Sequence, residues 1–123
     1  MVLVDTSVWS EHLRRHDPAL ARLLEAGEVW VHPFVIGEIA CGLFPQRRET
    51  LALLGNLPAA PLLSLDELLA FIERHALAGR GIGFVDIHLL ASARVVHAAI
   101  RTRDKRLAAA AAVLGCLDPS RAG

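Results

Sequence analysis

The amino-acid sequence predicts an α/β fold in which helices cover a parallel, doubly wound sheet. Short apolar runs alternate with longer segments of helical periodicity along the whole chain. Hydrophobic residues make up 54% of the 123 residues but aromatic residues only 5%, as expected for aliphatic strands buried on both faces. No repeat, low-complexity segment or shift in composition marks a boundary, so we expect a single domain over residues 1–123.

Two strands and four helices are expected in the first half of the chain. Asp17 is a suitable N-cap, with Pro18 at the first helical position and Gly27 at the end of that helix. The second strand is stopped by Pro33, and another helix begins there. The predicted strands are residues 2–4 and 29–31, and the helices begin near residues 8, 18, 33 and 45.

The second half of the chain repeats the alternation. Ser64 is followed three residues later by Glu67, a capping-box pattern that begins a helix running to about Ala78. The glycine-rich loop GRGIG leads into a helix over residues 85–96, and Asp104 begins the last helix. The predicted strands here are residues 61–65 and 98–102, with a further short strand at 116–119.

Composition excludes several classes of protein. Thirteen Lys and Arg residues balance thirteen Asp and Glu residues, which argues against general coating of nucleic acid but leaves room for a local basic rim. Cys41 and Cys116 form no CxxC pair, and we expect both to be small core residues. The sequence starts without a basic signal-peptide region, and its longest apolar run is too short to span a bilayer. We therefore expect a cytoplasmic protein that does not contact membranes.

Four acidic residues are expected to meet at one edge of the sheet, because ligands of parallel α/β sheets bind outside the carboxyl ends of the strands. They are Asp5 after the first strand, Glu38 in the helix after the second, Asp86 near the start of the helix at 85–96, and Asp104 after the strand at 98–102. Each acid also has a simpler explanation when taken alone. An aspartate at a helix start is often an N-cap, and a glutamate in an apolar stretch is often paired with an arginine.

Taken together, the four acids indicate a divalent metal. Carboxylates gathered at one edge repel one another unless positive charge holds them, and Mg²⁺ and Mn²⁺ prefer carboxylate and water oxygen. A metal held in this way activates water and stabilises the charge at a phosphate under attack. Thr6, Ser7 and Thr102 bring hydroxyls to the same edge, where they either support the acids or serve as turn residues. His32 and His88 can face the site, but no HxH or HExxH spacing is present.

Basic residues surround the last acid. They are Arg101, Arg103, Lys105 and Arg106. A basic rim beside an acidic metal pocket suits a phosphodiester substrate, since the cations contact the backbone while the metal acts on one phosphate. The alternative is a solvated polar turn.

Four segments, in this order and spacing, carry a family resemblance. They are VLVDTSVW at 2–9, HPFVIGEIACG at 32–42, GRGIGFVDIHLLASA at 79–93 and IRTRDKRL at 100–107. Together they closely resemble the PIN domain and, within it, the VapC toxins of prokaryotic type II toxin–antitoxin modules. The resemblance covers about residues 1–118.

The resemblance implies a three-layer α/β/α fold with about four to five short strands. It also implies a Mg²⁺- or Mn²⁺-dependent endoribonuclease whose metal is bound by an acid quartet. The matching positions are Asp5, Glu38, Asp86 and Asp104, with Thr6 or Ser7 and Thr102 in support. The family often has an aromatic residue soon after the last acid, where this chain has Lys105, Arg106 and Leu107. VapC proteins usually form homodimers and are inhibited by a VapB antitoxin, so we expect both partners here.

Two other functions stay open at this point. An inactive PIN relative would bind RNA or an antitoxin without cleaving RNA, although all four acids are retained. A phosphoaspartate enzyme of the haloacid dehalogenase type would use Asp5 as a nucleophile. Such an enzyme requires a second aspartate two positions later, where this chain has Ser7.

Overall fold

The computed structural model describes residues 1–119 and centres on a small parallel sheet. Its strands are β1 (Val2–Val4), β2 (Val29–Trp30) and β3 (Ala99–Arg101), in the order β2-β1-β3. Because β1 lies in the centre and pairs in parallel with both neighbours, the carboxyl ends of all three strands meet at one edge. The parallel α/β architecture predicted from the sequence is confirmed.

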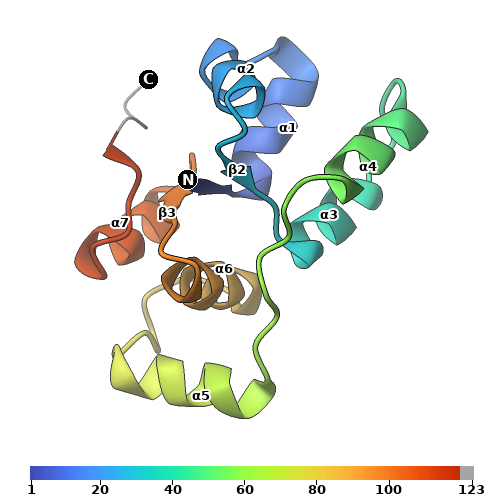
Figure 1. Ribbon diagram of the computed structural model, residues 1–123. Helices are drawn as coiled ribbons and strands as arrows, with labels where there is room; N and C mark the ends of the chain where they lie inside the picture. The colour runs from blue at the N-terminus through green and yellow to red at the C-terminus, as the bar shows by residue number, and fades with distance from the viewer. Residues whose placement is uncertain (120–123) are drawn as a thin grey trace.

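Seven helices surround this sheet within the described residues. They are α1 (Thr6–Arg15), α2 (Pro18–Glu25), α3 (Pro33–Ala40), α4 (Arg47–Gly55), α5 (Leu65–Arg74), α6 (Phe84–Val95) and α7 (Lys105–Val113). Figure 1 shows α1 and α2 on one side of the sheet, and α6 with α5 beyond it on the other. The helices α3 and α4 form an arm beside β2, and α7 lies next to β3. The arrangement is the expected α/β/α layering.

Local sequence signals explain where the helices begin. The side chain of Asp17 accepts hydrogen bonds from the amides of Ala19 and Leu20, with Pro18 at the first position of α2. Ser64 and Glu67 form the predicted capping box at the start of α5. That helix ends at Arg74, four residues earlier than predicted. It stops there because residue 76 has a positive φ of 51° and the chain turns back, with the amide of residue 77 bonded to the carbonyl of residue 72.

The strand predicted at residues 61–65 is wrong. In its place Ala59 forms an isolated parallel bridge with Val31, which bonds to the carbonyl of Pro58 and the amide of residue 60. Pro58 and Pro61 lack N–H donors, so the ladder cannot extend in either direction. The carbonyl of Pro61 instead accepts the hydroxyl of Ser92 on α6 at 2.7 Å. At the opposite edge, the short strand expected at 116–119 is reduced to one parallel bridge between residues 100 and 117.

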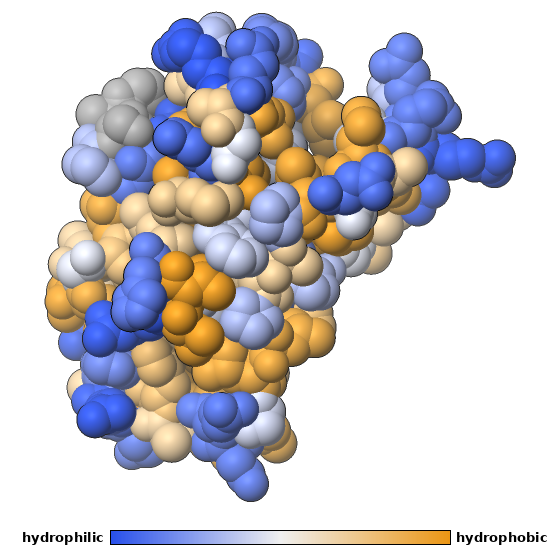
Figure 2. All heavy atoms as spheres, viewed as in Figure 1, coloured by the Kyte–Doolittle hydropathy of each residue, from blue (hydrophilic) through white to orange (hydrophobic). Residues whose placement is uncertain are grey.

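Aliphatic side chains fill the core on both faces of the sheet. Those with no exposed surface are Leu3, Val4, Leu20, Val35, Leu89, Leu90, Ile100 and Leu107. Other large apolar side chains stay on the surface, among them Leu43, Leu53, Leu62, Leu65, Leu69 and Val95. Figure 2 shows apolar surface across the middle of one face, between hydrophilic ends. Among the helices of residues 1–119, none has the length and apolar character needed to cross a membrane.

Candidate active site

The structure brings the four predicted acids to the carboxyl edge of the sheet. Asp5 follows β1 and is the N-cap of α1, and Asp104 follows β3 and is the N-cap of α7. Asp86 lies in the first turn of α6, while Glu38 extends from the middle of α3. The proximity of the four charges shows in Asp86, because the other three acids all raise the pKa of its carboxyl group.

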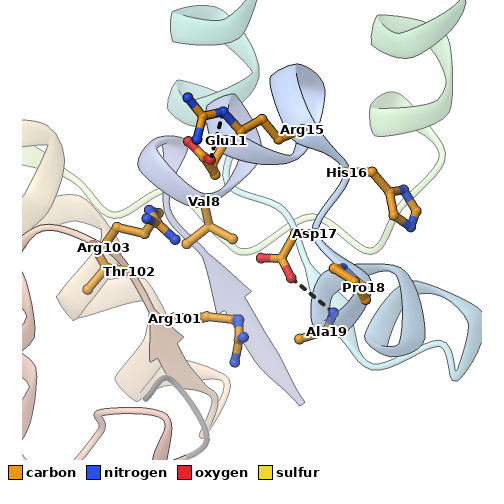
Figure 3. A pocket seen from close by; sticks show the side chains of 10 residues that line it. All are labelled: Val8, Glu11, Arg15, His16, Asp17, Pro18, Ala19, Arg101, Thr102 and Arg103. Atoms are coloured by element: carbon orange, nitrogen blue, oxygen red, sulfur yellow. Dashed lines mark hydrogen bonds and ion pairs between the residues drawn. The ribbon is translucent and has the colours of Figure 1, made fainter. Parts of the chain in front are cut away.

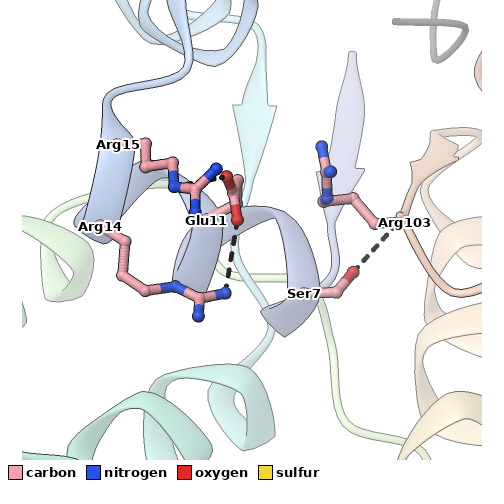
Figure 4. A network of polar contacts seen from close by, with 5 residues as sticks. All are labelled: Ser7, Glu11, Arg14, Arg15 and Arg103. Carbon is pink, nitrogen blue, oxygen red and sulfur yellow. Dashed lines mark hydrogen bonds and ion pairs between the residues drawn. The ribbon is translucent and has the colours of Figure 1, made fainter.

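Two hydroxyl groups hold the carboxylate of Asp5. Ser7 Oγ and Thr102 Oγ1 donate to Asp5 Oδ2 at 2.7 and 2.8 Å. Each hydroxyl also accepts a hydrogen bond from a backbone N–H at 3.0 Å. The amide of Arg103 donates to Ser7 Oγ (Figure 4), and the amide of Asp104 donates to Thr102 Oγ1. These bonds tie the end of β1 to the chain that follows β3. The supporting roles expected for Ser7 and Thr102 therefore have a geometric basis.

The other three acids are each held through one oxygen. Thr6 Oγ1 donates to Glu38 Oε1 at 2.5 Å, which fixes α3 against the start of α1. Asp86 Oδ2 accepts the amide of Gly83 at 3.1 Å. Asp104 Oδ1 accepts the two amides of the first turn of α7 at 2.8 and 3.1 Å. The second oxygen of all four carboxylates accepts no hydrogen bond from residues 1–119.

The charge of this acid cluster is not neutralised by basic side chains. In the described part of the chain, no Lys, Arg or His forms an ion pair with any of the four acids. The pKa of Asp86 is raised, first by burial and then by the charges of Asp5, Asp104 and Glu38, while the Gly83 amide works in the opposite direction. Such uncompensated negative charge favours a bound cation.

The donor set fits a hard divalent ion rather than zinc. Four carboxylates, each with an unused oxygen, are the ligands that Mg²⁺ and Mn²⁺ prefer. Within residues 1–119, no three His, Cys, Asp or Glu side chains are grouped tightly enough to enclose a metal ion. An open arrangement suits Mg²⁺, which usually keeps several waters and is bound by one or two carboxylates together with substrate phosphates.

The basic residues predicted around Asp104 fall into two groups. Arg103, Lys105 and Arg106 are exposed at the start of α7. Arg106 lies across Gly81, where a Cβ atom would stand 2.9 Å from its Cδ and Nη1 atoms, so the glycine permits this close contact. Arg101 differs, because it is buried and its Nη1 atom contacts Asp118 Oδ2 at 2.9 Å. The bridge between residues 100 and 117 brings this pair together, which indicates a structural role for Arg101.

A cavity of about 370 Å³ opens beside Thr102, between α1, α2 and the end of β3. Figure 3 shows Arg15 and Arg103 on its walls together with Glu11 and Asp17. Glu11 is paired with Arg15 at 3.8 Å, and Asp17 is engaged as an N-cap. The cavity therefore adjoins the acid cluster but has walls of mixed charge.

An aromatic cluster on the other side of the site was not predicted. The ring centroid of His88 lies 4.4 Å from that of Phe34 and 4.7 Å from that of Phe84, while His32 lies 5.7 Å away. His32 Nδ1 accepts the amide of Phe34, and burial, followed by the neighbouring histidine, lowers the pKa of His32 to about 4. Both histidines are buried, so they are not exposed ligands at the site. The i, i+4 spacing of Phe84 and His88 was the local signal for their contact, whereas nothing local indicates that Phe34 joins them.

The sequence matches a known family. Residues 2–113 match the family model for the PIN domain. The chain belongs to the PIN-domain family, and within it to the VapC type. It is 50% identical over 116 residues to "Ribonuclease VapC32" of Mycobacterium tuberculosis strain ATCC 25618 / H37Rv, covering 94% of both chains. The protein of the same name from strain CDC 1551 / Oshkosh gives the same identity and coverage.

Proposed function

We propose that the chain is a metal-dependent endoribonuclease toxin that cleaves RNA and so inhibits translation. The observation that carries the proposal is the cluster of Asp5, Glu38, Asp86 and Asp104. Among residues 1–119, one oxygen of each carboxylate accepts no hydrogen bond and no cation forms an ion pair with these acids. The similarity to a protein named a ribonuclease supports RNA as the substrate. Divalent metals are the usual cofactors of PIN ribonucleases, and the carboxylate donors favour Mg²⁺ or Mn²⁺.

The residues divide the chemistry among them. Asp5, Glu38, Asp86 and Asp104 would hold the metal. When bound, Mg²⁺ or Mn²⁺ supplies activation of water and neutralises charge at the scissile phosphate. Ser7 and Thr102 keep Asp5 in place through bonds of 2.7 and 2.8 Å, and Thr6 does the same for Glu38. In-line attack by water leaves a 5′-phosphate and a 3′-hydroxyl.

The exposed cations at the start of α7 would position the RNA. In the part of the chain that the structure describes, Arg103, Lys105 and Arg106 form no ion pair with the acids, and they lie next to Asp104 in sequence. Because the net charge of the chain is zero, these side chains would supply the local positive charge that binds RNA phosphates without regard to sequence. Because Arg101 is held by Asp118, we assign it to supporting β3 rather than to contacting RNA.

The same family membership suggests the partners. We propose that a cognate VapB antitoxin neutralises the activity, that the chain forms a homodimer, and that it acts in the cytoplasm. Large apolar side chains on the surface, including Leu43 at 95% exposure and Leu53 at 68%, offer area for such partners to cover.

Cleavage of total cellular RNA by the purified protein, free of antitoxin, tests the proposal. With Mn²⁺ or Mg²⁺ we expect discrete cuts that are lost in EDTA and in the variant Asp86→Asn. The matched control is Asp66→Asn, which removes an exposed acid from the first turn of α5, away from the site. Cuts that persist in EDTA or in Asp86→Asn would contradict the assignment. A folded protein that neither binds metal nor cuts RNA would instead be the inactive binding module.

A further inference from the structure

Two phenylalanine rings are exposed beside the acid cluster. Phe34 is 38% exposed and Phe84 is 48% exposed, although a small protein normally buries such rings. Both rings pack against His88, which is buried, so their positions are fixed by the core. The result is a rigid aromatic surface formed by Phe34 and Phe84, with His88 beneath it.

This aromatic surface is joined to the site by short helical spacings. Phe34 lies one turn before Glu38 on α3, and residues four apart on a helix share a face. Phe84 is the first residue of α6 and lies in the same turn as Asp86, although residues two apart on a helix point to different sides. The Phe34 ring of α3 contacts the His88 ring of α6, so each phenylalanine stands within one helical turn of an acid. A phosphate held at the acid cluster would therefore have its neighbouring nucleotide within reach of the rings.

The chemistry of the aromatic surface suits a base rather than a phosphate. It contains no Lys or Arg, whereas the exposed cations of the site lie at the start of α7. Phenylalanine offers a flat apolar face and no hydrogen-bonding group, so it binds the π-face of any base without reading its edges. A base inside an RNA duplex is already stacked on both sides, whereas an unpaired base is free to stack on a ring.

We propose that Phe34 and Phe84 form a stacking platform for the base next to the scissile phosphate. The inference rests on the proposed ribonuclease function and adds the residues that hold this base. Phosphate contacts at the start of α7 and base stacking between α3 and α6 then hold the strand from two sides of the acid cluster.

Binding measured without cleavage tests the platform. The full-length protein is titrated in EDTA with a fluorescent 12-nucleotide oligo(A), and anisotropy gives the affinity. Stacking on an aromatic side chain is worth about a 5- to 150-fold change in affinity per base, so Phe34→Ala and Phe84→Ala should each weaken binding by that order. Phe84→Trp should retain binding, because it keeps an aromatic face. Val113→Ala, which truncates a side chain of 65% exposure at the end of α7, is the control and should change nothing.

Two further readouts separate stacking from other causes. The slope of log affinity against log salt should be the same in Phe84→Ala as in the wild type, whereas Arg106→Ala should make it shallower by about 0.7. A duplex of the same length should bind the wild type and Phe84→Ala equally. Phe84→Leu fills similar volume without a π-face, so affinity equal to the wild type in this variant would overturn the proposal.

The outcomes also distinguish this inference from the proposed function. Cleavage with Mn²⁺ that is intact in the wild type, together with unchanged binding in the phenylalanine variants, would overturn the platform alone. Binding that depends on the rings but leads to no cleavage would overturn the nuclease assignment alone. Sedimentation of each variant covers the remaining case: if binding is lost only where a dimer dissociates, the rings belong to an interface between copies and the platform is wrong.

Discussion

Asp86→Asn should make the metal-free protein more stable, although it removes an acid from a helix start. An acid in the first turn normally stabilises a helix by about 0.3–1 kcal/mol. At Asp86 this gain is opposed, because burial and the charges of Asp5, Asp104 and Glu38 raise the pKa of the carboxyl group. Asparagine keeps an oxygen that accepts the Gly83 amide, so the substitution removes charge while preserving the cap.

The expected gain in stability of Asp86→Asn can be estimated from the usual effect of removing an unfavourable charge. Relief of unfavourable surface charge commonly stabilises by about 0.5–2 kcal/mol, and the half-buried position of Asp86 places the expected gain near 1 kcal/mol. With about 2.1 cal/mol/K of unfolding entropy per residue over 123 residues, 1 kcal/mol corresponds to about 4 °C in Tm. Metal at ten times its Kd stabilises the wild type by RT ln 11, about 1.4 kcal/mol, or about 5 °C. The order of the two Tm values should therefore reverse when metal is added.

Thermal unfolding followed by circular dichroism, in EDTA and then with Mn²⁺, measures both effects. Asp66→Asn is the control, because it sits in the first turn of α5 and should lose a few tenths of a kcal/mol with or without metal. Ionised Asp86 destabilises the fold above its raised pKa, and this cost disappears as the pH falls through that pKa towards the ordinary value of 3.8. The advantage of Asp86→Asn should shrink over the same range. A lower Tm for Asp86→Asn in EDTA at pH 7 would refute the electrostatic reasoning.

Three other predictions concern the surroundings of the acids. Thr102→Val removes a buried hydroxyl that donates to Asp5 and accepts a backbone N–H. Urea unfolding should show a free energy of unfolding that is lower by about 2–3 kcal/mol, and RNA cleavage should fall by more than the loss of folded protein accounts for. Gly81→Ala should lower the free energy of unfolding by about 1–2 kcal/mol, because residue 81 has a φ of 74° and the added Cβ would contact Arg106. The part of this cost that comes from the contact should vanish in an Arg106→Ala background, and equal costs in both backgrounds would exclude the contact. The lowered pKa of His32 should make unfolding easier as the pH falls from 6.5 to about 4, because the unfolded chain takes up a proton that the folded chain refuses. His32→Asn replaces the Nδ1 acceptor of the N-cap with an amide oxygen and should flatten this pH dependence; a slope as steep as the wild type's would assign it to other groups.

Local chemistry made much of the fold and of the acid cluster predictable. A strand of three aliphatic residues followed by Asp5 places a carboxylate at a strand end, wherever the rest of the chain lies. For Asp5 and Asp104 the sequence left two explanations open, an N-cap and a site residue. The structure shows that capping uses a single oxygen of each carboxylate, Oδ2 of Asp5 and Oδ1 of Asp104. The two explanations are therefore compatible.

Features that depend on tertiary register were not predictable. Arg101 is one of four basic residues among residues 101–106, and nothing local separates it from Arg103. Its pairing with Asp118 exists because residues 100 and 117 form a bridge, which brings together positions 17 apart in the chain. The aromatic surface has the same origin, since Phe34 and Phe84 belong to different motifs and meet only through His88.

The fold of this protein should not depend on the proposed metal, and the reason lies in the helices. Three of the four acids stand at helix N-termini: Asp5 at α1, Asp86 at α6 and Asp104 at α7. Each N-terminus carries the equivalent of about half a positive charge, so the backbone itself offsets part of the repulsion between the carboxylates. Glu38 has no such support, but it is exposed and hydrogen-bonded to Thr6. Peptide dipoles thus offset part of the repulsion between the acids in the metal-free protein, and the negative charge that remains is what the proposed divalent cation would neutralise.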